Sequence, residues 1–374
     1  MKSFWTIAGV IVLALAGYFI LAEKPNNQAG GEPIKIGVVA SLTGAGSFYG
    51  ENVRNGVQMA AEEIYAAGGI DGQPLEIIFE DDQTNPQKTV TAVKKLATLD
   101  NVIAVIGPQW DFQVNAALPL AIEYKLPFIS PATAFDTLIP SNRSNPYFFA
   151  TYPPVSGAYE AIGAFLTRTK AKTGVILAVN NDWGVANTVA YQTVADSMGV
   201  KVLDIIRLTQ TDNNEFRTQV AQIKQMDPDA IFMSINDADA INLVKWHKEF
   251  SLRSAVLNNQ NFGYLIRAGR LDPKAAEGFY FSDFNNPNAK FIADYNKRYG
   301  KDPQITADTA YDTVYILKEA ISKGAATKEG MLEGLEKISG FKGVSGMIDF
   351  TTAHYPTTKK AVLRHIIGGR IETL

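Results

Sequence analysis

The sequence contains no cysteine, so disulfide bonds, thiolate nucleophiles and cysteine-based metal sites are excluded. Histidine is nearly as scarce: His247, His354 and His365 are the only ones in 374 residues. None lies at metal-ligand spacing from another, and solvated or capping roles are their default. We therefore expect neither a metal site nor a cofactor. The net charge is −3 and no long basic run is present, so nothing indicates a nucleic-acid partner.

Signature motifs of common enzyme classes are also missing. The chain has no G-x-S-x-G nucleophile elbow, Walker loop, G-x-G-x-x-G fingerprint or H-E-x-x-H helix. Residues 41–50, SLTGAGSFYG, place glycines between a strand and a helix, but they lack the lysine that would contact phosphates. The carboxylate cluster at 80–82 is explained by loop hydrogen bonds and capping. These absences predict a protein that is not an enzyme.

One apolar run stands at the N-terminus. Residues 4–22, FWTIAGVIVLALAGYFILA, carry no charge and suit either a transmembrane anchor or a cleaved signal peptide. Tyr18 stands where a lipid-acylated cysteine would be required, so lipid anchoring is excluded. Residues 23–33 form a polar tether rich in Pro, Gly and Asn. Both alternatives place the remaining chain outside the cytoplasm, in the periplasm or on the outer face of the cytoplasmic membrane.

From residue 34 onward, short apolar runs alternate with amphipathic stretches of helical period. Such near-continuous apolar strands joined by helices predict a parallel sheet covered on both faces. The pattern restarts after residue 150, which predicts two doubly wound α/β lobes. The expected strands are 34–40, 75–81, 101–107 and 126–130 in the first unit, and 173–179, 201–207, 229–235, 254–258 and 278–284 in the second.

Polar or aromatic residues follow five of these strands. In open parallel sheets, ligands bind beyond the carboxyl ends of the strands. The sequence therefore predicts a cleft between the lobes. The residues at these ends are Trp110-Asp111-Phe112, 130–134, Asn181-Asp182-Trp183, Asn236 and 258–260.

The stretch from residue 34 to 108 resembles the leucine/isoleucine/valine-binding protein family, which are type I periplasmic solute-binding proteins of ABC importers. The resemblance covers about residues 34–370. The resemblance rests on the SLTG…YG start, the GGI-x-G-x-P-L hairpin, the DDQ-x-x-P turn and the V-x-x-V-I-G-P strand end, followed by LPFISPATA. It implies two lobes joined by three crossover strands, near Tyr152, Phe284 and 343–346. The first lobe would hold 34–152 and 284–343, and the second 153–283 and 344–374, including the SGMIDF segment (345–350).

The family's ligand-contacting positions carry over residue by residue. Asp111 stands where amino-acid binders have a serine that holds the ligand carboxylate, and Gln260 stands where they have an acidic residue for the ammonium group. A threonine of the next loop aligns with Ala134, one position after Thr133. The remaining implied contacts are Ala132 through its backbone, Tyr49 and Trp183 as aromatic lining, Asn236 where an aromatic is frequent, and Trp110 beside Asp111.

These differences from the family's ligand-contacting residues change which ligand we expect. An ionised Asp111 would repel a ligand carboxylate in a poorly hydrated cleft, so a neutral polar or cationic solute is favoured, with an amino acid or amide still open. The rings at 49, 110, 112 and 183 would add cation–π contacts of ~0.5–2 kcal/mol each. Alternatively, Asp111 caps a helix that starts near Gln113 and points away from the ligand. For Tyr49 and Trp183, the alternative to ligand contact is that their rings only pack against neighbouring side chains.

We therefore expect an exported, monomeric solute-binding protein that closes on a small ligand and docks on a membrane permease. Two other functions stay open. The same fold supplies ligand-sensing modules for separate signalling receptors, and it also hosts α/β enzymes. The missing nucleophile–base pair argues against the enzyme.

Overall fold

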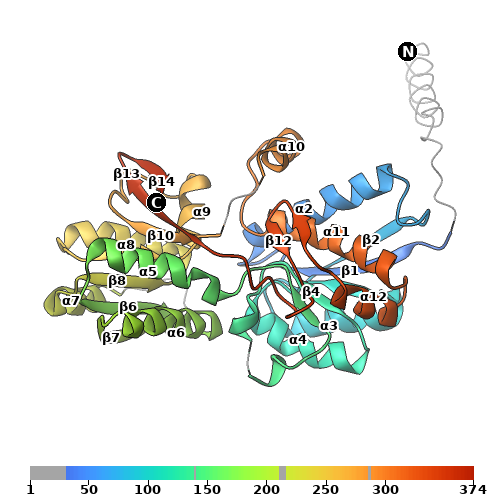
Figure 1. Ribbon diagram of the computed structural model, residues 1–374, viewed down its shortest axis with the longest axis horizontal. Helices are drawn as coiled ribbons and strands as arrows, with labels where there is room; N and C mark the ends of the chain where they lie inside the picture. Colours follow the sequence, from blue (N-terminus) through green and yellow to red (C-terminus); the bar gives the residue numbers. More distant parts are fainter. Residues whose placement is uncertain (1–30, 139, 210–215, 285–287) are drawn as a thin grey trace, which may run out of the picture.

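The computed structural model describes residues 31–374, apart from 139, 210–215 and 285–287. The expected anchor or signal segment at 1–22 lies outside the described residues, as does most of the tether. Within the described part, no helix is long and apolar enough to cross a membrane. The chain forms two α/β lobes that lie side by side (Figure 1).

The first lobe is built on a five-stranded parallel sheet in the order β2-β1-β3-β4-β5. Neighbouring residues of a strand point to opposite faces, so Ile36 and Val38 pack against α2 (Ser47–Ala66) and α11 (Ala307–Lys323). Val39 packs on the other face, against α3 (Pro86–Lys95) and α4 (Asp111–Glu123). The strands are β1 (Ile34–Ala40), β2 (Leu75–Asp81), β3 (Ala104–Ile106), β4 (Phe128–Ser130) and β5 (Phe148–Ala150).

Helices from two distant parts of the chain cover this sheet. The α10 helix packs on α2 through Phe291 and Tyr295, which contact Met59. Three short helical turns, η1 (Leu96–Asp100), η2 (Phe135–Thr137) and η3 (Pro140–Asn142), complete the lobe. Its helices are α2 (Ser47–Ala66), α3 (Pro86–Lys95), α4 (Asp111–Glu123), α10 (Ala289–Tyr299), α11 (Ala307–Lys323) and α12 (Lys328–Glu336).

The second lobe has a seven-stranded sheet in the order β14-β13-β10-β9-β8-β6-β7. Five strands are parallel as predicted, but β13 and β14 add an antiparallel edge that the sequence analysis did not foresee. The strands are β6 (Thr173–Val179), β7 (Lys201–Leu208), β8 (Ala230–Ser234), β9 (Ala255–Asn258), β10 (Tyr280–Asp283), β13 (Val362–Ile367) and β14 (Arg370–Thr373).

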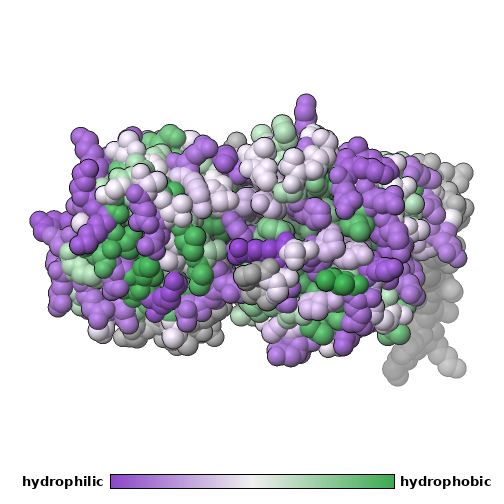
Figure 2. All heavy atoms as spheres, turned by 60° about the horizontal axis from the view of Figure 1, so that its bottom comes forward, coloured by the Kyte–Doolittle hydropathy of each residue, from purple (hydrophilic) through white to green (hydrophobic). Residues whose placement is uncertain are grey.

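Both faces of the second sheet are covered. One face packs against α5 (Tyr159–Thr169) and α6 (Asp182–Ser197). The other packs against α7 (Arg217–Met226), α8 (Asp237–Glu249) and α9 (Asn261–Arg267). On the outside, hydrophobic residues show in small groups between hydrophilic ones on the face seen in Figure 2, which is typical of a globular surface.

Three segments cross between the lobes. The first follows β5, next to Tyr152, and the second follows β10, next to Phe284. All three meet at Gly157, in the short helical turn η4 (Val155–Ala158). A methyl group added there would lie 2.6 Å from the backbone oxygen of Lys359 and 2.8 Å from Cε1 of Phe284. Only a residue without a side chain lets these segments approach so closely.

The third crossing differs from the expectation. We placed it at 343–346, with SGMIDF in the second lobe, but β11 (Phe341–Gly343) and β12 (Gly346–Ile348) form a hairpin on the first lobe. The reason is hydrophobic burial, because Ile348 and Phe350 are 0% and 2% exposed in the core beneath α2 and α11. The chain stays on this lobe through His354, whose carbonyl accepts from the Ala150 amide at 2.8 Å. It joins the second lobe at Ala361.

Candidate functional site

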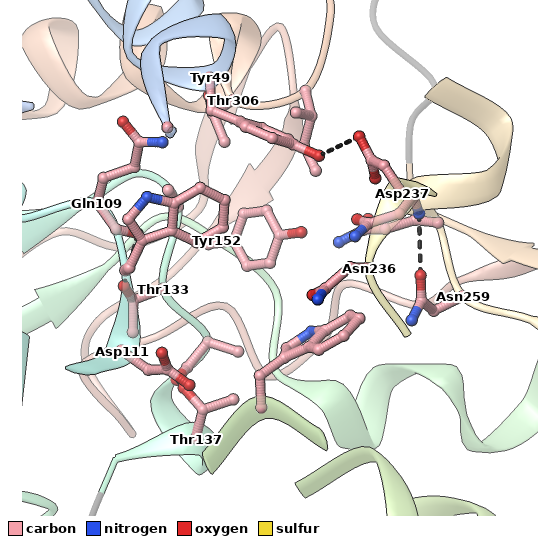
Figure 3. A pocket seen from close by; sticks show the side chains of 18 of the residues that line it. Tyr49, Gln109, Asp111, Thr133, Thr137, Tyr152, Asn236, Asp237, Asn259 and Thr306 are labelled. Carbon is pink, nitrogen blue, oxygen red and sulfur yellow. Dashed lines mark hydrogen bonds between the residues drawn. The ribbon is translucent and has the colours of Figure 1, made fainter. Parts of the chain in front are cut away.

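A cavity of about 650 Å³ lies between the lobes, and both line it (Figure 3). In each sheet the order of strands reverses next to the first strand, at β1/β3 and at β6/β8. Loops leaving the carboxyl ends at such a reversal diverge and open a crevice. Residues after β1, β3, β6 and β8 line the cavity, so the site is a direct result of the winding.

All nine residues expected at the site line this cavity. Lobe 1 contributes six of them and lobe 2 three, and in Figure 3 Asp111 and Thr133 face Asn236 across the space. The lobe 1 residues are Tyr49, Trp110, Asp111, Ala132, Thr133 and Ala134, and those of lobe 2 are Trp183, Asn236 and Gln260.

Asp111 is buried, with 8% of its surface exposed. Its Oδ1 accepts from the backbone amide of Phe112 at 2.8 Å, whereas Oδ2 has no partner among the described residues. Burial raises the pKa of Asp111 to about 6, and the charge of Asp182 in the other lobe adds to this rise. The backbone amides of Phe112 and, from the other lobe, of Trp183 partly oppose it. A buried carboxylate oxygen without a partner is costly, so this position favours a ligand that donates a hydrogen bond or carries positive charge.

The capping interpretation of Asp111 is wrong. The helix α4 begins at Asp111 itself, and Trp110 occupies the capping position. The backbone amide of Trp110 donates to Oε1 of Gln113 at 3.3 Å, and Asp111 accepts from the first-turn amide of Phe112 through Oδ1 alone. The Asp111 side chain is thereby left for the cavity.

The loop after β4 is largely occupied by its own hydrogen bonds. The amides of Ala132 and Thr133 donate to Oγ of Ser130 at 3.4 and 3.1 Å. The Thr133 hydroxyl donates to the carbonyl oxygen of Gln109 at 3.0 Å. Thr133 can therefore offer a ligand only the lone pairs of its oxygen, and its visible role is to fix the backbone of Gln109.

Direct contacts join the two lobes around the cavity. The Tyr49 hydroxyl donates to Oδ2 of Asp237 at 3.0 Å, and Nη1 of Arg270 contacts the same oxygen at 2.6 Å. The Arg270 guanidinium also lies 5.8 Å from the ring centre of Phe48 in the first lobe. Burial is the main cause that raises the pKa of Tyr49 well above its usual value, so its hydroxyl stays protonated as a donor.

The wall contributed by the second lobe is mostly amide side chains. Gln260 is 8% exposed and immediately precedes α9, and Trp183 is half-buried at the start of α6. Asn259 accepts from the Asn261 amide at 3.0 Å through Oδ1, and its Nδ2 has no partner within the described ranges. This wall therefore offers amide donors and one flat ring to a ligand.

Sequence reasoning missed several lining residues. Gln109 and Asp237 adjoin expected positions and could have been found by extending each strand end by one residue. Arg270 and Thr306 come from segments that no strand-end rule selects. The charged side chains of the lining are Asp111, Asp237, Asp239 and Arg270, so carboxylates exceed cations.

Known proteins resemble this chain over almost its whole length. A leucine-, isoleucine-, valine-, threonine- and alanine-binding protein of Pseudomonas aeruginosa is 23% identical over 92% of this chain and 90% of its own length. The isoleucine complex of the branched-chain amino acid transporter substrate binding protein LivJ from Streptococcus pneumoniae superposes with a TM-score of 0.80 at 23% identity, covering 91% of this chain and 99% of that one.

A solute binding protein of an ABC transporter from R. palustris, in complex with benzoate, has a TM-score of 0.78 at 19% identity, covering 91% of this chain and 95% of its own. These likenesses support the same two-lobed fold. A family model described as "Periplasmic binding protein" matches residues 33–369. The chain therefore belongs to the periplasmic binding protein family.

Proposed function

We propose that this chain is an extracytoplasmic solute-binding protein that captures a small ligand between its lobes and delivers it to an ABC importer. One observation carries the proposal: a single cavity is lined by strand ends of both lobes, so a ligand there touches both walls at once. A ligand shifts an open–closed equilibrium only by what it gains in the closed form. Contacts to both walls supply that difference.

The ligand we propose is a neutral polar or cationic molecule. Arg270 is the one cation among the lining side chains, and it already contacts Asp237. A ligand carboxylate would thus meet Asp111 without a free positive charge nearby. Amino acids remain candidate ligands because relatives of this chain are named as amino-acid-binding proteins. An ionised Asp111 nevertheless disfavours a pose in which the ligand carboxylate lies at the start of α4. The proposed partner is a membrane permease, and the proposed location is outside the cytoplasm. The protein would act as a monomer that binds its ligand without converting it chemically.

A thermal-shift screen of the purified protein tests this proposal. The panel contains α-amino acids, amides, primary amines and polyamines, aromatic acids and sugars. We expect amines or amides to raise the unfolding midpoint most, because a ligand that binds only the folded state stabilises it by mass action.

Two variants separate charge from shape. Asp111→Asn keeps the shape and should weaken amine binding at least tenfold, and Asp111→Ser should do the same. If α-amino acids stabilise the protein best and Asp111→Ser leaves that unchanged, the charge argument fails. If no small solute raises the midpoint, solute binding itself is contradicted.

A further inference from the structure

A second group of buried polar atoms lies at the other end of the cavity from Asp111. Gln109 is 1% exposed, and neither Nε2 nor Oε1 of its side chain has a hydrogen-bond partner in the described part of the chain. The same holds for Nε1 of Trp110 and for Oγ1 of Thr306, which is 3% exposed. All three residues line the cavity, and we call them the Gln109 corner.

The corner is placed by contacts within the first lobe. Gln109 is fixed through its carbonyl by the Thr133 hydroxyl. Thr309 donates to the carbonyl oxygens of Pro131 at 2.7 Å and of Thr306 at 3.2 Å, which attaches the start of α11 to the same loop. Figure 3 accordingly shows Gln109 and Thr306 near Tyr49 at one end of the cavity, and Asp111 with Thr137 at the other.

The backbone of Thr306 is an independent sign of function. Its φ is +71°, in the left-handed region that a β-branched residue rarely adopts. Such strain persists where the surroundings impose it, and it clusters at ligand sites. Here it occurs in a cavity-lining residue whose hydroxyl has no partner in the described ranges.

The chemistry of the corner selects its occupant. A glutamine amide offers two donors and one acceptor, an indole nitrogen offers a donor, and a hydroxyl offers both. No charged group belongs to the corner, so its complement is a neutral group that donates and accepts together. We propose that the Gln109 corner is a specificity subsite for a carboxamide or ureido group of the ligand.

This inference rests on the proposed function and adds the ligand's second group. Gln109 and Asp111 are two positions apart, so their Cα atoms are separated by at most about 7 Å. The cavity that both side chains line has a volume of about 650 Å³, so a ligand that reaches both is a small molecule with a carboxamide or ureido group at one end. Its other end carries an amine or N–H for Asp111.

Matched ligand pairs test the subsite. Glycinamide, β-alaninamide and 4-aminobutanamide are each compared with the amine in which a methyl group replaces the carboxamide, by calorimetry and thermal shift on the full chain. We expect at least one amide to bind about tenfold or more tightly than its methyl partner, because a site built for hydrogen bonds rejects an analogue that lacks them. Gln109→Leu and Thr306→Val should each reduce that ratio severalfold.

Control variants separate this subsite from folding and from Asp111. Thr188→Val removes a buried hydroxyl that already bonds Gly184 in α6, outside the lining, so it should lower the melting temperature without changing the ratio. Asp111→Asn should weaken both members of each pair. The subsite is refuted if the pairs bind equally, if none binds while other solutes do, or if Gln109→Leu and Thr306→Val fold and keep the amide preference. Failure of every solute would instead refute solute binding.

Discussion

At the scale of single residues, Asp111 links stability to pH. Its pKa is raised from 3.8 to about 6 in the folded protein, so the folded state holds a proton that the unfolded state releases. Stability from this group is therefore greatest below pH 4 and falls as the pH rises through 6. At 1.36 kcal/mol per pKa unit, the loss at neutral pH is about 3 kcal/mol.

We therefore predict that Asp111→Asn stabilises the ligand-free protein at pH 7.5 by up to about 3 kcal/mol, because the amide carries no charge to bury. At pH 4 the two proteins should differ little. Thermal unfolding of both proteins across pH 4–8 checks this. A variant less stable than the parent at pH 7.5 would show that the carboxylate has a favourable partner.

The same proton affects binding. An amine that pairs with ionised Asp111 must displace the proton below pH 6, so its affinity should be constant above pH 6 and fall about tenfold per pH unit below it. Calorimetric titrations of the best amine between pH 4.5 and 8 measure this slope. In Asp111→Asn the affinity should no longer depend on pH in this range. If the pH dependence is retained, another titrating group causes it.

The nine residues proposed for the site from the sequence all line the cavity, whereas other residues named at strand ends, such as Asp182 and Asn258, do not. The sequence could not foresee the state of each side chain. The Thr133 hydroxyl donates to the Gln109 carbonyl, and Asp111 keeps one oxygen without a partner in the described residues because the Phe112 amide bonds only the other. Neither arrangement is visible without coordinates. Thr306 lies almost two hundred positions from Asp111, so only folding reveals that they share a site.

At the scale of elements, α2 and α8 meet across the cavity through Tyr49 and Asp237. We predict that Tyr49→Phe weakens ligand binding up to about tenfold, because a hydrogen bond to a charged group contributes about 1.5 kcal/mol and this one exists only when the lobes are together. Arg270 still neutralises Asp237 in the variant.

Tyr65 provides the control for this substitution. It lies in the same helix with 58% of its surface exposed, so Tyr65→Phe should leave the affinity unchanged. Calorimetry on the two variants measures the difference. Equal affinities would mean that the bridge from α2 to α8 does not stabilise the closed form.

The alternation of strands and helices was predictable because it reflects periodic burial, and the parallel strands of both sheets followed from it, except β5, which was not expected. The third crossing was not predictable. The segment from 345 to 350 carries too few apolar residues to reveal which core it joins, and the decision depends on Ile348 and Phe350 finding space beneath α11. The edge strands β13 and β14 lie after the third crossing in the chain, so they too could not be predicted without knowing where the chain crosses.

At the scale of the whole molecule, Gly157 lies where the crossing segments pack together. We predict that Gly157→Ala lowers stability by about 1–3 kcal/mol, because the methyl group would overlap the Lys359 carbonyl and displace one segment from the others. Ligand affinity should fall with it, since the lobes would no longer meet in register.

Gly163→Ala is the matched control. That glycine lies in α5, where an added methyl group would have its nearest neighbour at 3.7 Å. The change should be neutral or stabilising by up to about 1 kcal/mol, as alanine favours helices. Melting temperatures and calorimetric affinities are measured for both variants. A loss confined to Gly157→Ala shows that the packing of the crossing segments is responsible, whereas equal losses would show that any glycine-to-alanine change destabilises the protein.

The repeated crossing also governs the order in which the molecule can be made. During synthesis the first sheet emerges early, yet α11 and the β11–β12 hairpin, which bury one of its faces, are translated about 160 and 190 residues after β5. The second sheet receives its last strand only at Thr373. Each lobe therefore waits with part of its core uncovered while residues of the other lobe are translated, and that apolar surface must stay unaggregated in the meantime.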